Sequence, residues 1–165
     1  MMTLQSPDFS RDMRPGEEPA VDALLRAAFV GGEDEVALVR KLRKSRAIAG
    51  ETVLPMGDRI VGYYALSRLV SPKGWLVLAP VAIDPDMQGA GHGRRMIGML
   101  TEWARLTRTP VVVLGQPAFY EKAGFSKEQA SRLRSPYPPE YILLASCAGG
   151  QPAETLVYPT AFAAA

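Results

Sequence analysis

Apolar positions near the start of the chain predict two amphipathic helices. They recur every three or four residues over 21–28 and again over 36–42, which is the spacing of a helix with one buried face. Pro19 falls in the first turn of the first helix, where a missing N–H costs least. Gly31-Gly32 separates the two helices, and the second starts with the acidic residues 33–35, which complement the helix dipole.

Three extended apolar runs follow, at residues 47–54, 59–69 and 75–83. The loop Pro55-Met56-Gly57-Asp58 predicts that the first two form an antiparallel hairpin. The third run is almost wholly apolar, as expected of a strand covered on both faces. It contains Pro80, which cannot donate to a sheet ladder. A proline in a central strand indicates a bulge, or a place where the neighbouring strand has diverged.

Helices and strands alternate in the second half of the chain. An amphipathic helix follows the glycine-rich stretch 88–93, and a short strand at 111–114 leads to a short helix at 118–124. Further extended segments are expected at 141–146 and near 156–158. This order predicts an α+β fold in which helices cover a mixed sheet.

Composition and charge narrow the class of protein. The 165 residues fit one domain, and we expect loose ends at 1–12 and 160–165. A formal charge of +2 argues against a general binder of nucleic acid or membrane surfaces. With one cysteine, Cys147, and one histidine, His92, no disulfide framework and no cysteine- or histidine-rich metal site is expected. No run approaches a signal peptide or a membrane helix, so we expect a cytoplasmic protein.

A glycine-rich turn, Gln88-Gly89-Ala90-Gly91-His92-Gly93, lies between the third apolar run and the long helix. Glycines let the backbone approach an anion closely, and the first free N–H groups of a helix favour phosphate. The same glycines also suit a tight turn that binds nothing. A dinucleotide fingerprint would need its third glycine at Arg94 or Met96, and a P-loop needs a Gly-Lys-Ser/Thr, so both are excluded.

Two motifs together resemble the GNAT superfamily of acyl-CoA-dependent N-acetyltransferases. Gln88-x-x-Gly91-x-Gly93 is similar to the family's pyrophosphate loop, and FYEKAGF at 119–125 is similar to its second conserved element. They stand in the family's order, one helix and one strand apart, and the resemblance covers roughly residues 13–146. The segments GQPAFY and ETLVYPTAF are similar to a bacterial subgroup often called YhbS-like. The resemblance implies the GNAT fold: a mixed, mostly antiparallel sheet flanked by helices, with splayed central strands.

The resemblance also implies acetyl-CoA as co-substrate and assigns residues to it. The strand at residues 75–83 would offer its backbone to the pantetheine arm of CoA. The glycine-rich turn after it would hold the pyrophosphate with its backbone N–H groups. Arg95 either approaches another CoA phosphate or belongs to a solvated helix face, and His92 stands where the family usually has an aliphatic residue. The residues expected to bind acetyl-CoA are Val81, Ala82, Ile83, Gln88, Gly89, Ala90, Gly91, His92, Gly93 and Arg94.

Tyr120 matches the family's tyrosine that protonates the departing CoA thiolate. A phenol with a pKa near 10 is an adequate acid beside a thiolate whose conjugate acid has a pKa of about 8.5. The alternative is a half-buried packing residue. No carboxylate interrupts residues 75–83, so the general base stays open among Glu33, Glu35, Asp84 and a water relay.

We predict direct transfer of an acetyl group to a small-molecule or peptide amine, with oxyanion stabilisation by backbone N–H groups near Ala82 and Ile83. No acyl-enzyme is expected, because Cys147 lies far along the chain from both motifs. The acceptor pocket is expected from residues 29–34 and the terminal strands. Gly115-Gln116-Pro117 stands where many relatives have an asparagine before the tyrosine helix, which weakens the assignment of cofactor contacts there. The alternative function is a non-catalytic acyl-CoA-binding or sensing module, and a homodimer stays open.

Overall fold

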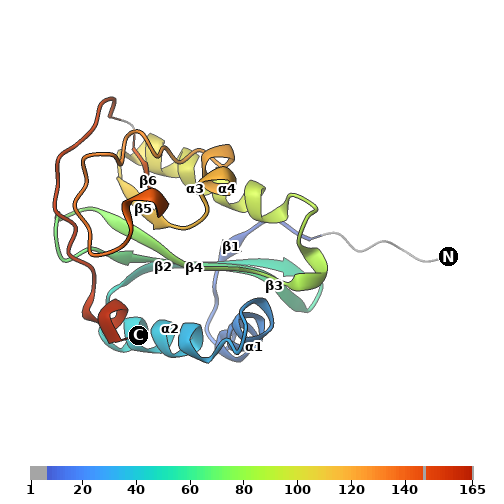
Figure 1. Ribbon diagram of the computed structural model, residues 1–165. Helices are drawn as coiled ribbons and strands as arrows, with labels where there is room; N and C mark the ends of the chain where they lie inside the picture. Colours follow the sequence, from blue (N-terminus) through green and yellow to red (C-terminus); the bar gives the residue numbers. More distant parts are fainter. Residues whose placement is uncertain (1–6, 147, 165) are drawn as a thin grey trace.

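The computed structural model describes residues 7–146 and 148–164. Helices α1 (Glu18–Ala28) and α2 (Glu33–Lys44) lie side by side on one face of a sheet (Figure 1). Both predicted helices are present, and each begins three residues before the first apolar position of its pattern. At Gly32, which has a φ of +62°, a Cβ would lie 2.2 Å from Cα of Arg26. The sharp reversal between the helices therefore requires glycine.

Within the described residues, six strands form one sheet in the order of the sequence. Neighbouring strands are antiparallel, except that β4 and β5 are parallel. The predicted mixed, mostly antiparallel sheet is confirmed. The strands are β1 (Arg11–Asp12), β2 (Ile48–Met56), β3 (Arg59–Arg68), β4 (Leu76–Ile83), β5 (Val111–Leu114) and β6 (Ile142–Ala145).

Strand β4 is bulged at Pro80 and parts from β5 at the same place. On the β3 side, Tyr64 pairs with Val81 and Leu66 with Leu78, so residues 79–80 oppose a single residue. On the β5 side, pairing ends at Leu78 and Val113, and residues 79–83 have no strand beside them in the described chain. The bulge and the splayed central strands are both confirmed.

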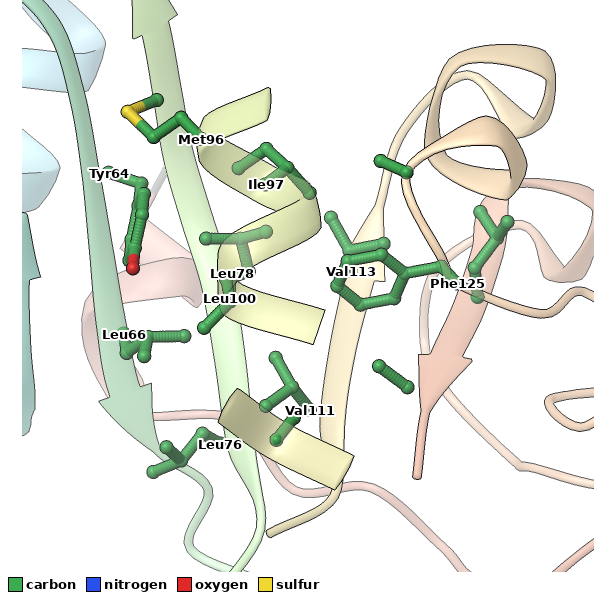
Figure 2. Close-up of a cluster of buried hydrophobic side chains, with 14 of the residues drawn as sticks. Tyr64, Leu66, Leu76, Leu78, Met96, Ile97, Leu100, Val111, Val113 and Phe125 are labelled. Atoms are coloured by element: carbon green, nitrogen blue, oxygen red, sulfur yellow. The ribbon is translucent and has the colours of Figure 1, made fainter. Parts of the chain in front are cut away.

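Helices α3 (His92–Thr107) and α4 (Pro117–Lys122) cover the second face of the sheet. Figure 2 shows how side chains of β3, β4 and β5 meet the apolar face of α3 in a buried cluster. None of the described helices is long and apolar enough to cross a membrane. The labelled members of this cluster are Tyr64, Leu66, Leu76, Leu78, Met96, Ile97, Leu100, Val111, Val113 and Phe125.

The two ends of the described chain are ordered, which corrects the expected loose ends. Arg11 pairs with Val53 of β2. Near the C-terminus the chain passes the end of the sheet and forms a 3-10 helix, η3 (Thr160–Ala164), against α2 (Figure 1). Ring burial explains this docking, because Phe162 packs in the apolar cluster beneath it. The expected extended segment near 156–158 forms only isolated bridges, such as Ser71 with Val157. Residues 1–6 and 165 lie outside the described part.

Candidate active site

The glycine-rich turn is fixed to the end of β4 by two side chains. Asp84 Oδ1 accepts a hydrogen bond from the N–H of Asp86 at 2.9 Å, which caps the 3-10 helix η1 (Pro85–Met87). Gln88 Nε2 donates to the carbonyl of Ile83 at 3.0 Å. The turn therefore starts from a defined position beside the open part of the strand.

Backbone N–H groups of the turn are free to bind an anion. Within the described chain, the N–H groups of residues 89–94 have no protein acceptor. Gly89 and Gly91 both have a φ of +84°, and a Cβ at either position would meet nothing within 4 Å. Gly91 is also the N-cap of α3, whose first N–H groups and dipole favour negative charge. Residues 88–94 form what we call the cradle.

Gly93 also has a packing role. A Cβ there would lie 3.2 Å from Cγ1 of Ile83 and 3.4 Å from Cζ of Phe119. Because Gly93 has no side chain, the first turn of α3 can approach both β4 and α4 closely. The cradle, the end of β4 and the tyrosine helix therefore meet at Gly93.

A shallow groove of about 420 Å³ runs from the cradle along α3 to the end of α4. It is lined by Ala90, Gly91, Arg94, Arg95, Gly98, Lys122 and Ala123. The cationic side chains there suit the phosphates of a nucleotide. Arg95 also lies within hydrogen-bond distance of His92 Nδ1, so these two residues contact each other on an exposed helix face.

The open edge of β4 presents the backbone of two of the three expected residues. The N–H of Asp84 donates to the carbonyl of Val61 at 2.8 Å, and Tyr63 lies opposite Ala82. Hydrogen-bonded pairs alternate along an antiparallel ladder, so the backbone of Ala82 is directed to β3, whereas that of Val81 and Ile83 is directed to the side that β5 has left. The expectation that Ala82 offers its backbone to a ligand is therefore wrong.

Tyr120 is held by rings and by close contact with a glycine. Its ring centroid lies 4.9 Å from that of Phe119 and 5.7 Å from that of Phe125, both edge-to-face. A Cβ at Gly115 would lie 2.3 Å from Tyr120 Cε2. Burial raises the pKa of Tyr120 to about 12. The hydroxyl has no hydrogen-bond partner among the described residues, so it is a protonated and unengaged donor.

The structure separates the three carboxylates considered as general base. Glu33 pairs with Arg26 at 2.6 Å on the exposed surface. Asp84 pairs with Arg59 at 3.0 Å, in addition to capping η1. Glu35 alone of the three lines a cavity, which has a volume of about 430 Å³ and lies between α2 and the parted strands.

The sequence analysis missed the residues that form the rest of this cavity, here called the α2 cavity. They include Ala79 and Leu114, the first residues beyond the pairing of β4 with β5, and three aromatic rings, Tyr137, Tyr158 and Phe162. The available signal was the aromatic content of the chain after residue 136, of which only Phe162 lies in a segment expected to be loose. Cys147 lies outside the described residues. Within them, no group of three His, Cys, Asp or Glu side chains could hold a metal ion.

These features define a member of the GNAT acetyltransferase family, and the chain belongs to it. Residues 47–127 match the family model described as an acetyltransferase (GNAT) domain. A curated relative is the uncharacterized N-acetyltransferase YhbS of Escherichia coli K12, which is 32% identical over 130 residues, or 75% of this chain and 77% of the relative. The predicted family and subgroup are confirmed.

Two solved structures share the fold. YhbS from Escherichia coli, in complex with CoA, superposes with a TM-score of 0.84 at 25% identity over 99% of this chain and 95% of that chain. A GNAT family acetyltransferase from Brucella melitensis, in complex with acetyl-CoA, has a TM-score of 0.77 at 24% identity over 93% of this chain and 97% of that chain. The predicted GNAT fold is confirmed.

Proposed function

We propose that this protein transfers an acetyl group directly from acetyl-CoA to an amine. The observation that carries the proposal is the parting of β4 from β5 after Leu78 and Val113. The cradle lies beyond the end of β4, and Tyr120 lies against Gly115 where β5 ends. The α2 cavity begins at the same opening, since Ala79 and Leu114 line it. A thioester and an amine can therefore meet between the strands.

Acetyl-CoA binds to backbone groups more than to side chains. The free N–H groups of the cradle hold the pyrophosphate, and the groove with Arg94 and Lys122 takes the nucleotide end. The pantetheine arm lies along the open edge of β4 and pairs with Val81 and Ile83, as a further strand would. The CoA and acetyl-CoA complexes of the two structural relatives support acetyl-CoA as the co-substrate.

Transfer proceeds by attack of the amine nitrogen on the thioester carbonyl carbon. The C–N bond forms and the carbonyl oxygen becomes an oxyanion, stabilised by an N–H of the open β4 edge in a water-poor site. The expected donor at Ala82 is replaced by Val81 or Ile83, because the N–H of Ala82 serves the sheet. The C–S bond then breaks, the amine loses its proton to a base, and the CoA thiolate leaves.

Tyr120 donates the proton that converts the leaving thiolate to a thiol. Its pKa of about 12 is above the value of about 8.5 of an ordinary thiol. The same burial destabilises a thiolate formed beside Tyr120 and so raises the pKa of the leaving thiol. The difference between the pKa values of Tyr120 and of the thiol is therefore smaller in the site. Because the hydroxyl has no protein acceptor among the described residues, its proton is available to the thiolate.

Tyr120→Phe tests the proposal. The variant keeps the ring contacts with Phe119 and Phe125 and removes only the hydroxyl. We expect kcat to fall about 10²–10⁴-fold, with the Kd of acetyl-CoA unchanged in calorimetry. Release of CoA thiol is followed with a broad amine panel. Wild-type kcat when chemistry limits the rate would make Tyr120 a packing residue, and tight acetyl-CoA binding with no thiol release for any amine would favour a sensing module.

A further inference from the structure

The α2 cavity starts where the paired part of the sheet ends. The last paired residues of β4 and β5 are Leu78 and Val113, and the next residue of each strand, Ala79 and Leu114, lines the cavity. Its volume of about 430 Å³ is at the small end of the range for small-molecule sites. The cavity therefore suits a small molecule whose reactive end reaches the opening between the strands.

One wall of the α2 cavity is aromatic and neutral. The ring centroids of Tyr137 and Tyr158 lie 5.0 Å apart, and those of Tyr158 and Phe162 lie 5.9 Å apart. The hydroxyl of Tyr158 shares a hydrogen bond of 3.1 Å with Ser135 Oγ, and that of Tyr137 donates to the carbonyl of Phe162 at 3.5 Å. Burial raises the pKa of both tyrosines, so the wall stays uncharged.

The opposite wall, on α2, carries charge of both signs. Asp34 and Glu35 lie in the first turn, and Lys41 lies six residues beyond Glu35, about 9 Å further along the helix axis. None of the three forms an ion pair with another described residue. Asp34 and Glu35 line the cavity together with Ala79, the first residue of β4 beyond its pairing with β5.

We propose that the acetyl acceptor is a small primary monoamine on a flat, apolar body without a carboxylate. This inference rests on the proposed function. The ammonium of the acceptor pairs with Glu35 near the opening and passes its proton to that carboxylate before attack, directly or through water. The apolar body of the acceptor packs on the rings of Tyr137, Tyr158 and Phe162, and burial of its apolar surface there stabilises the complex.

The charges on α2 are expected to weaken the binding of two other classes of amine, α-amino acids and diamines. An α-amino acid carries its carboxylate two bonds from the amine, which places it beside Asp34 and Glu35 and not beside Lys41. A diamine that pairs one ammonium with Glu35 brings its second ammonium toward the cation of Lys41. Both are expected to bind more weakly than a monoamine with an aromatic body.

The test uses the full chain saturated with CoA and three probes: 2-phenylethylamine, phenylalanine and 1,4-diaminobutane. Calorimetry should show 2-phenylethylamine binding at least tenfold more tightly than either of the others. Glu35→Gln should weaken its binding at least fivefold, whereas the matched control Glu33→Gln, whose carboxylate faces Arg26 at 2.6 Å, should have no effect. Phe162→Leu should weaken 2-phenylethylamine more than 1,4-diaminobutane, with folding checked by thermal melting.

Binding and turnover separate this inference from the proposed function. Equal or tighter binding of phenylalanine or 1,4-diaminobutane, or equal effects of Glu35→Gln and Glu33→Gln, overturns the acceptor class even if thiol release occurs with other amines. Expected binding of 2-phenylethylamine together with no thiol release from acetyl-CoA supports the acceptor pocket and contradicts catalysis. Expected binding with thiol release that Glu35→Gln reduces in kcat supports both. Glu35 is only half-buried, so Glu35→Gln is expected to fold and keeps the test valid if Phe162→Leu does not fold.

Discussion

Gly115, at the turn from β5 to α4, determines where the hydroxyl of Tyr120 lies. A Cβ at Gly115 would be 2.3 Å from Tyr120 Cε2 and 3.0 Å from Cδ2. Carbon atoms in contact are about 3.5–4.0 Å apart, so Gly115→Ala requires the ring or the turn to move by more than about 1 Å. Phe119 and Phe125 hold the ring on other sides, so the movement carries the hydroxyl with it.

The size of this displacement determines how far kcat is expected to fall. Misplacement of a reacting group by about 1 Å costs on the order of 10²-fold in rate. We therefore expect Gly115→Ala to lower kcat about 10²-fold. Overpacking of this kind lowers the free energy of unfolding by about 1–3 kcal/mol. The Kd of acetyl-CoA should change little, because the cradle is built at the start of α3.

A double-mutant cycle with Tyr120→Phe identifies the cause of the rate loss. If Gly115→Ala acts through the hydroxyl, it should cost almost nothing further in kcat once the hydroxyl has been removed. Gly50→Ala is the matched control, since a Cβ at Gly50 meets nothing within 4 Å and kcat should be unchanged. If Gly115→Ala lowered kcat as strongly in the Tyr120→Phe variant as in the wild type, the reasoning would be refuted. Gly115→Ala would then act on a group other than the hydroxyl of Tyr120.

Three further predictions concern the cradle, the N-terminal segment and the cysteine. Gly93→Val pushes α3 away from β4 and α4, so calorimetry should show CoA affinity at least tenfold lower, or about 1.4 kcal/mol; unchanged affinity in a folded variant would contradict the assignment of the cradle. The pKa of Glu17 is lowered to about 2, first by its hydrogen bond to Arg11 and then by a backbone N–H. This carboxylate stabilises the fold above its unfolded pKa and loses that effect as pH falls toward 2, so urea titrations should show Glu17→Gln costing about 1 kcal/mol at pH 7 and almost nothing near pH 2. Cys147→Ala should keep most turnover, and rapid mixing should detect no protein-bound acetyl group; a stoichiometric adduct at Cys147 would overturn direct transfer.

Local signals predicted most of the fold. Apolar spacing located α1, α2 and the hairpin of β2 and β3, because each element buries a face that its own residues define. Pro80 predicted the break in β4, because its missing N–H is a property of one residue. The docking of η3 could not be predicted in this way. It depends on contacts between η3 and α2, which lie more than a hundred positions apart in the chain, and no local pattern records such contacts.

In the candidate site, too, features set by local sequence were predictable, whereas features set by tertiary structure were not. The glycines of the cradle were predictable because a φ of +84° at Gly89 and Gly91 is a local requirement. The error at Ala82 arose because the direction of a backbone N–H depends on the phase of the ladder, which the bulge at Pro80 resets. The base could not be chosen from the sequence, because Glu33 and Glu35 are about 200° apart around the helix and only one faces the cavity.

The open edge of β4 explains why donor and acceptor can meet inside the sheet. An unpaired backbone N–H or C=O away from water costs about 1–3 kcal/mol, so the N–H and C=O of Val81 and the N–H of Ile83 favour a ligand that pairs with them. The carbonyl of Ile83 already accepts a hydrogen bond from Gln88. β5 cannot close over them, because after Leu114 the chain turns at Gly115 into α4 and the ring of Tyr120 lies against that turn. The residue proposed as acid thus also lies where closure of the sheet is prevented. Loss of its ring, in contrast to loss of its hydroxyl, should therefore weaken acetyl-CoA binding as well as catalysis.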